Sequence, residues 1–249
     1  MKYVRCIPAY IDFITALVKA EKYRKPIETC RAEGRFEEER ENIRLACLTF
    51  VDHILDKWDF TINVTGEENL PKEGPVVYIA NHQSYADALG TLKVISERHQ
   101  IGYIGKDYFG KIPYFGKWVS AIRCIYIQRG NTRNSLRVIG EGVEYLKDGF
   151  SMLIFPEGTR SKTEEVGEFK PGSFKLATKA QVPIIPISLN DGRRLYEDQE
   201  YVLKGKKIDM IIHPPIQTAG LSRQELAEIP EKVEEIIRQG VEELRSRGK

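Results

Sequence analysis

A histidine and an aspartate stand close together directly after an apolar run of the sequence. His82 and Asp87 are separated by four residues and follow residues 76–80, which have the composition of a buried strand. A turn leading into a helix can fold the Asp87 carboxylate toward the imidazole, fix its tautomer and leave the other ring nitrogen to remove a proton. The pair predicts general base catalysis on a hydroxyl group, with a structural, hydrogen-bonded histidine as the alternative.

A second polar block, residues 155–161, follows another apolar run. Gly158 lets the backbone turn tightly and approach a ligand closely, and the planar guanidinium of Arg160 suits bidentate binding of phosphate. Glu157 is expected to pair with that guanidinium and orient it. A tight surface turn with an ion pair explains this block as well as a phosphate site does, so both interpretations stay open.

Two further cations stand at the ends of other predicted strands. Lys106 follows residues 101–105, and Arg129 follows a run that ends at Ile127. In an α/β sheet the loops after the strands open into the crevice where reacting groups collect. Each of these cations alone is an ordinary solvated charge, but Lys106, Arg129 and Arg160 after three separate strands favour a shared phosphate pocket.

The elements that must position these residues alternate between strands and helices from about residue 60 onward. Apolar runs predict strands at residues 61–64, 76–80, 101–104, 122–127, 152–155, 184–189 and 208–212. Helical character is found at residues 87–98, 134–147, 173–179 and 223–245. Continuous apolar strands separated by helices predict an α/β fold, with a mixed, largely parallel sheet covered by helices on both faces.

Two amphipathic helices are predicted before this region. Residues 1–25 carry six basic and two acidic side chains, and apolar residues recur there at helical spacing, with Pro8 expected to start or bend the helix. The second helix is predicted at residues 35–58. Asp12 interrupts the best apolar run and Lys19 ends it, so no segment reaches the roughly twenty residues of a membrane span. The same aspartate disfavours a cleaved signal peptide.

These two helices either pack on the rest of the domain or lie in the membrane interface, with basic residues near anionic headgroups. The chemistry of the polar blocks favours the second interpretation. We therefore divide the chain into an amphipathic helical membrane-association element, residues 1–59, and an α/β catalytic domain, residues 60–249. A peripheral, monotopic location on the cytoplasmic face of the cell membrane is expected.

Composition narrows the classes of partner. With 38 basic and 36 acidic residues among 249, the net charge is +2, so the chain lacks the positive field typical of nucleic-acid binders and no nucleic-acid partner is expected. The four cysteines lie far apart, which fits neither a disulfide framework nor a zinc site and indicates a reducing compartment. The four histidines are equally scattered, so no metal site is expected.

Four ordered blocks together resemble the lysophospholipid and glycerol-phosphate acyltransferase family. Residues 81–87 resemble its His-x-x-x-x-Asp block, and residues 155–161 match its Phe-Pro-Glu-Gly-Thr-Arg-Ser block. Residues 106–129 resemble its second block and residues 182–186 its proline-bearing fourth. In the second block this chain has Arg123 where a glycine is common and Gln128 where an acidic residue often stands.

The resemblance implies transfer of a fatty acyl group from an acyl thioester to the sn-2 hydroxyl of lysophosphatidic acid. His82, oriented by Asp87, is expected to deprotonate that hydroxyl, which attacks the thioester directly without a covalent acyl-enzyme. The thioester, on acyl carrier protein or coenzyme A, is a co-substrate, and no cofactor is expected. Glycerol 3-phosphate or another lysophospholipid remains an alternative acceptor, and the oligomeric state stays open. A lipid-phosphate hydrolase and a non-enzymatic lipid-binding protein are the alternatives of other classes.

The resemblance also implies a phosphate pocket. Its expected members are Lys106, Arg129, Glu157, Gly158, Thr159 and Arg160. Separately, an aromatic-rich stretch at residues 108–118 is expected either to line an apolar groove for the acyl chain or face the bilayer, or to pack in the core.

Overall fold

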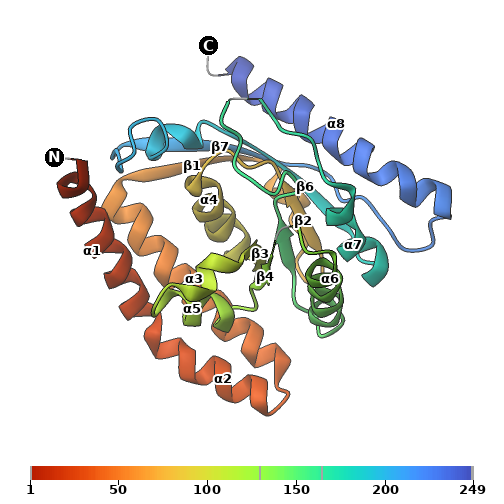
Figure 1. Ribbon diagram of the computed structural model, residues 1–249, viewed down its shortest axis with the longest axis horizontal. Helices are drawn as coiled ribbons and strands as arrows, with labels where there is room; N and C mark the ends of the chain where they lie inside the picture. The colour runs from red at the N-terminus through yellow and green to blue at the C-terminus, as the bar shows by residue number, and fades with distance from the viewer. Residues whose placement is uncertain (1, 129, 164, 248–249) are drawn as a thin grey trace.

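A seven-stranded sheet in the order β1-β7-β6-β2-β5-β3-β4 forms the centre of the protein (Figure 1). The computed structural model describes residues 2–128, 130–163 and 165–247. The strands are β1 (Phe60–Thr65), β2 (Val77–Ala80), β3 (Gly102–Lys106), β4 (Ile125–Ile127), β5 (Met152–Ile154), β6 (Ile184–Asn190) and β7 (Lys206–Ile212). Neighbouring strands are parallel except β6 and β7, which are antiparallel. The prediction of a mixed, largely parallel sheet is confirmed.

Helices cover both faces of this sheet. They are α1 (Lys2–Ala20), α2 (Arg24–Ala32), α3 (Phe36–Trp58), α4 (Tyr85–Ser96), α5 (Phe115–Ala121), α6 (Thr132–Lys147), α7 (Lys175–Ala180) and α8 (Arg223–Arg247). Figure 1 shows α6, α7 and α8 on one side of the sheet and α1, α3, α4 and α5 on the other. The buried apolar side chains accordingly form two clusters, one between the sheet and each helical layer.

The position of β2 in the middle of the sheet explains why its sequence is continuously apolar. Val77 and Ile79 point into the cluster under α6 to α8, whereas Tyr78 and Ala80 point into the cluster under α1 to α5. All four side chains are fully buried, because successive residues of a strand face opposite sides of the sheet and both sides are covered here.

The N-terminal helices share a core with the sheet. Leu17 of α1 and Ile43 of α3 belong to the same buried cluster as Tyr78 of β2, and Phe13 packs edge-on against Phe50 with ring centroids 5.3 Å apart. The interpretation that the N-terminal helices pack on the rest of the domain therefore holds for one face of α1 and α3. The predicted boundary between residues 59 and 60 stays a prediction.

The opposite face of α1 is apolar and exposed. Ile7, Tyr10, Ile11 and Val18 are 52%, 66%, 56% and 59% exposed. Pro8 lies inside this helix. Within residues 2–128, 130–163 and 165–247, the structure contains no helix with the length and apolar character needed to cross a membrane.

The aromatic stretch 108–118 divides between core and surface. Trp118 is 4% exposed and belongs to the core, and Phe115 packs against Phe13 with ring centroids 5.3 Å apart. Tyr108 and Ile112 are about two-fifths exposed, at 41% and 40%. The prediction of core packing therefore holds for Trp118. For the exposed Tyr108 and Ile112, contact with the acyl chain stays a prediction.

A buried ionic cluster ties the N-terminal helices to the strand β4. Glu39, near the start of α3, is fully buried, and its two carboxylate oxygens accept hydrogen bonds from Nε and Nη2 of Arg123 at 2.7 and 2.6 Å. Arg31 of α2 donates to the same carboxylate at 2.8 Å. Arg123, two residues before β4, is 7% exposed, and its guanidinium lies over the ring of Phe150 at 4.3 Å.

Candidate active site

The loop after β2 leaves the sheet at a buried asparagine. Asn81 is fully buried, and its side-chain amide bonds both peptide groups of Leu189 in β6: Nδ2 donates to the carbonyl at 2.9 Å, and Oδ1 accepts from the N–H at 2.8 Å. These bonds hold the chain against β6 at the point where His82 begins to face the carboxyl edge of the sheet.

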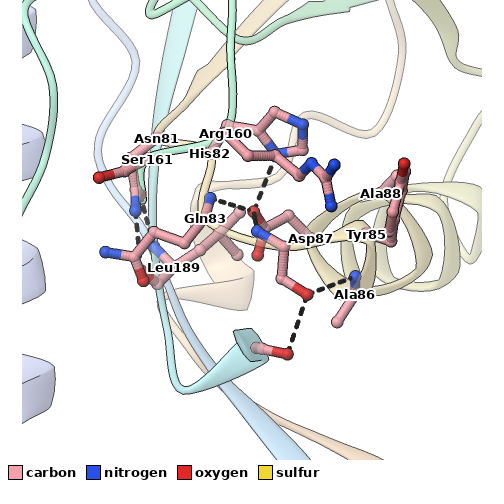
Figure 2. A network of polar contacts seen from close by, with 12 residues as sticks. Asn81, His82, Gln83, Tyr85, Ala86, Asp87, Ala88, Arg160, Ser161 and Leu189 are labelled. Carbon is pink, nitrogen blue, oxygen red and sulfur yellow. Dashed lines mark hydrogen bonds and ion pairs between the residues drawn. The ribbon is translucent and has the colours of Figure 1, made fainter. Parts of the chain in front are cut away.

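His82 and Asp87 form the hydrogen-bonded pair that the sequence predicted. Nδ1 of the imidazole lies 2.9 Å from Oδ2 of Asp87 (Figure 2). The same oxygen accepts from the N–H groups of Gln83 and Ser84 at 2.6 and 2.7 Å. Ser84 is the N-cap of α4, and Asp87, the third residue of the helix, completes the capping box. The cap therefore folds Asp87, which is 1% exposed, back onto the imidazole.

Phe155 fixes the plane of the His82 ring. The two rings stack with centroids 4.0 Å apart and an interplanar angle of 15°, and the His82 side chain keeps 18% exposure. With Nδ1 donating to Asp87, the imidazole has Nε2 as its proton-accepting nitrogen. The arrangement suits removal of a proton from a bound hydroxyl group.

The expected pairing of Glu157 with Arg160 is wrong. Glu157 is 6% exposed, and its carboxylate instead accepts from the N–H of His82 at 2.7 Å and the N–H of Gly167 at 2.9 Å. Burial raises the pKa of Glu157 above its ordinary value, and those two N–H donors oppose the shift. Glu157 thus connects the backbone of His82 to the loop after β5, because a buried carboxylate needs donors and these peptide groups supply them.

Replacing Glu157 with glutamine is expected to destabilise the protein by about 1–3 kcal/mol. The one oxygen of the glutamine amide can accept from the N–H of either His82 or Gly167. The amide NH2 group then faces the other N–H, which loses its acceptor. Urea denaturation of both proteins measures the difference. Glu168→Gln, an exposed change in the same loop, is the control, and equal losses in the two variants would contradict the assignment.

Arg160 is held by a carboxylate that the sequence analysis missed. Its Nη1 donates to Oε1 of Glu197 at 2.7 Å, and its guanidinium lies over the ring of Tyr85 at 3.8 Å from the centroid. The N–H of the next residue, Ser161, donates to the carbonyl of His82 at 2.7 Å. Figure 2 shows the Arg160 guanidinium on the same side as the His82 ring, between that ring and Tyr85. The predicted base and this cation are therefore brought together.

Gly158, Thr159 and Lys106, three further predicted residues, lie at the same edge of the sheet or beside it. Gly158 adopts a left-handed conformation (φ 69°) in the turn closed by its N–H on the Phe155 carbonyl at 3.0 Å, as the sequence predicted for a tight turn. Thr159 is exposed and Lys106, the last residue of β3, is half-buried. Since β5 lies between β3 and β2, the backbone of Lys106 lies roughly 10 Å from β2. Arg129 lies outside the described residues.

Several known proteins are similar in sequence to a large part of this chain. A chloroplastic 1-acyl-sn-glycerol-3-phosphate acyltransferase of Arabidopsis thaliana is 35% identical over 159 residues, which are 63% of this chain and 44% of that protein. The human 1-acyl-sn-glycerol-3-phosphate acyltransferase alpha is 28% identical over 208 residues, 83% of this chain and 71% of that protein. The chain thus spans about half the length of the plant relative, at 44%.

A solved structure shares the fold along nearly the full chain. The crystal structure of the 1-acyl-sn-glycerophosphate (LPA) acyltransferase PlsC from Thermotoga maritima matches with a TM-score of 0.72 and 26% sequence identity, and covers 98% of both chains. The family model described as Acyltransferase matches residues 61–190, more than half of the chain, including the His82–Asp87 and 155–161 blocks. The chain therefore belongs to the acyltransferase family.

Proposed function

We propose that this protein is a 1-acyl-sn-glycerol-3-phosphate O-acyltransferase, which converts lysophosphatidic acid to phosphatidic acid at the expense of an acyl thioester. The observation that carries the proposal is the His82–Asp87 pair, 2.9 Å apart, on the same side as the guanidinium of Arg160. A base beside a phosphate-binding cation is what an acceptor carrying both a hydroxyl and a phosphate requires.

The base acts on the acceptor hydroxyl. Nε2 of His82 takes its proton while the hydroxyl oxygen forms a bond to the thioester carbonyl carbon. The resulting tetrahedral intermediate collapses, the carbon–sulfur bond breaks, and the departing thiolate takes the proton from the imidazolium. Asp87 stabilises the imidazolium during this exchange, because its carboxylate is already oriented by the cap of α4.

Thiol release is the direct test. The purified protein is incubated with acyl-coenzyme A or acyl carrier protein thioesters and with lysophosphatidic acid, glycerol 3-phosphate or a lysophospholipid with a larger headgroup. The proposal predicts thiol release that depends on lysophosphatidic acid and yields phosphatidic acid with one of the two donors. Release without any acceptor, or release only with another acceptor, would contradict it.

The exposed apolar face of α1 supports peripheral binding to a lipid surface. Ile7, Tyr10, Ile11 and Val18 stay exposed although other apolar side chains of this helix are buried, and Lys19, Lys22 and Lys25 follow in the sequence. An apolar face beside basic residues is typical of helices that lie in the membrane interface. On this proposal the active site faces a bilayer that contains the acceptor.

The double change Ile7→Glu and Ile11→Glu is expected to weaken binding to anionic phospholipid vesicles by at least about tenfold, because two exposed apolar side chains that would insert into the lipid surface become charged. Vesicle co-sedimentation measures the binding. Leu136→Glu is the matched control, since Leu136 lies on α6 and is 58% exposed. A similar loss in both variants, or none in either, would remove α1 as the binding face.

A further inference from the structure

Residues 107–114, between β3 and α5, expose apolar side chains although their backbone is closely packed. Tyr108, Ile112 and Tyr114 are 41%, 40% and 37% exposed. A Cβ on Gly116 would lie 2.3 Å from a backbone oxygen of this segment, and the N–H of Gly116 donates to the carbonyl of Ile112 at 2.8 Å. The exposed side chains are therefore carried by a backbone with little room to fold them inward.

A turn centred on Tyr114 separates exposed from packed side chains. Tyr114 has φ 64° and ψ −53°, and the N–H of Phe115 donates to the carbonyl of Pro113 at 2.7 Å. These are the features of a γ-turn of the rare, strained kind, and strained conformations cluster at functional sites. The turn leaves Tyr114 at the surface while the next residue, Phe115, packs against Phe13 of α1.

Two contacts place the 107–114 segment beside the exposed face of α1. Phe13 contacts the start of α5, and the hydroxyl of Tyr114 donates to Oε2 of Glu21, directly after α1, at 3.0 Å. Side chains three positions apart are neighbours on a helix surface. Phe13 therefore adjoins the exposed Tyr10, and Glu21 adjoins the exposed Val18 in the same way. The exposed apolar surface of α1 thus continues onto the 107–114 segment.

The charges around this segment favour an anionic surface. Residues 106–117 contain three lysines and one acidic residue, Asp107, and so carry two net positive charges. Lys111 pairs with Asp107 at 3.2 Å, and its side chain is 75% exposed. Lys117 of α5 is also exposed. Exposed apolar side chains among lysines are typical of surfaces that bind anionic lipids.

The other end of the segment reaches the candidate active site. Tyr108 follows the last residue of β3 by two positions, and its hydroxyl is hydrogen-bonded to the side chain of Tyr85. Tyr85 is the first residue of α4, and its ring lies under the guanidinium of Arg160, 3.8 Å from the centroid. Exposed aromatic side chains therefore continue from the 107–114 segment to the site.

We propose that the 107–114 segment is a second element that contacts a phospholipid bilayer, with Ile112 and Tyr114 among the lipid chains beside α1; this inference rests on the proposed function. A contiguous apolar surface rimmed by polar residues marks an interaction site, and its continuity with the exposed face of α1 selects the same lipid partner. Tyrosine suits the boundary of a bilayer because its ring is apolar and its hydroxyl is polar. An acceptor lipid then reaches the site from the bilayer along Tyr108 and Tyr85.

Tryptophan placed in the segment tests this contact directly. In Ile112→Trp, the emission added over that of the parent is expected to shift to shorter wavelength with vesicles of phosphatidylglycerol and phosphatidylcholine, and to be quenched when their acyl chains are brominated. Tyr10→Trp, on the exposed face of α1, is the positive control, and Leu136→Trp, on α6, is the negative control. Quenching in Tyr10→Trp without quenching in Ile112→Trp would overturn the inference and leave α1 as the binding face.

Ile112→Glu measures how much the contact contributes. Its apparent affinity for the same vesicles is expected to fall by about fivefold, because a side chain that is 40% exposed no longer enters the lipid and becomes charged. Leu136→Glu is the matched control and is expected to bind within about twofold of the parent. Urea denaturation checks that both variants fold. An equal change in the two variants would overturn the inference.

The fluorescence measurement contains neither lysophosphatidic acid nor a thioester, so its result is independent of acyl transfer. Quenching in Ile112→Trp would support the inference even if the protein showed no transferase activity. Its absence would overturn the inference even if the parent were fully active. If Ile112 instead contacts the acyl chain of a bound substrate, the added emission would be unchanged by vesicles and would respond to palmitoyl-coenzyme A in their absence, which would also overturn the inference.

Discussion

His82→Ala is expected to lower kcat for acyl transfer to lysophosphatidic acid by about a hundred- to ten-thousand-fold. The change removes the proposed base but leaves Asp87 with two donors, the N–H groups of Gln83 and Ser84. The cap of α4 and the fold are therefore expected to survive, so the loss reports chemistry. Thiol release under saturating substrates measures kcat, and urea denaturation checks the folding of the variant.

His53→Gln is the control for this experiment. His53 lies five residues before the end of α3, beside Lys19 of α1, with Nδ1 2.9 Å from the lysine Nζ. Its kcat is expected within about twofold of the parent, as for surface changes away from the site. Near-normal turnover by folded His82→Ala would refute the general base mechanism.

Glu39→Ala is expected to destabilise the protein by about 3–5 kcal/mol, since it leaves the buried guanidinium of Arg123 without its carboxylate. A loss of this size is a large part of the ~5–15 kcal/mol that keeps a domain folded. Arg123 cannot turn to water easily, because it is 7% exposed and lies over the rings of Phe150 and Tyr145 at 4.3 and 4.7 Å. The midpoint of urea denaturation measures the effect.

Two further variants isolate the ion pair. Glu41→Ala, on the same helix, removes a carboxylate that is 52% exposed and paired with Arg44, and is expected to cost at most about 1 kcal/mol. The double variant Glu39→Ala with Arg123→Gly is expected to recover part of the lost stability, because no buried charge remains and glycine suits the left-handed backbone (φ 61°) at that position. A loss in Glu39→Ala no greater than in Glu41→Ala would contradict the assignment.

The sheet and the hydrogen bond between His82 and Asp87 could be predicted because their signals are local. Each buried strand is a short apolar run, and the 82–87 block lies within one turn and one helix cap, so a few neighbouring residues determine its geometry. The predicted strand at residues 122–127 is shorter in the structure, Ile125–Ile127. Arg123 precedes it in a left-handed conformation that favours a turn over a strand.

The partners of the polar block could not be predicted because they are distant in the sequence. Glu197 is 37 residues from Arg160, and Gly167 meets Glu157 through a peptide N–H that carries no sequence signature. The sequence favours pairing Glu157 with Arg160 because the two stand three residues apart. A buried carboxylate is satisfied by whichever donors the folded loop brings to it, and here these are peptide groups.

The sequence does not predict the helix α2, for a different reason. Among its nine residues only Ile27 and Cys30 are buried, and Pro26 stands near its start, so the apolar periodicity that indicates a helix is too short to recognise. Its place in the fold depends on tertiary contacts such as the hydrogen bond from Arg31 to the buried Glu39 of α3.

The side chain of Asn81 imitates a peptide group, and this has a consequence for what the position tolerates. Because its amide both donates to and accepts from Leu189, the main chain can change direction there without orphaning a peptide group of the neighbouring strand in the dry interior. Aspartate has no N–H to offer the Leu189 carbonyl, and leucine has neither partner. The carboxamide of asparagine, with its length and its paired donor and acceptor, thus allows β2 to end at this point and the chain to turn at His82.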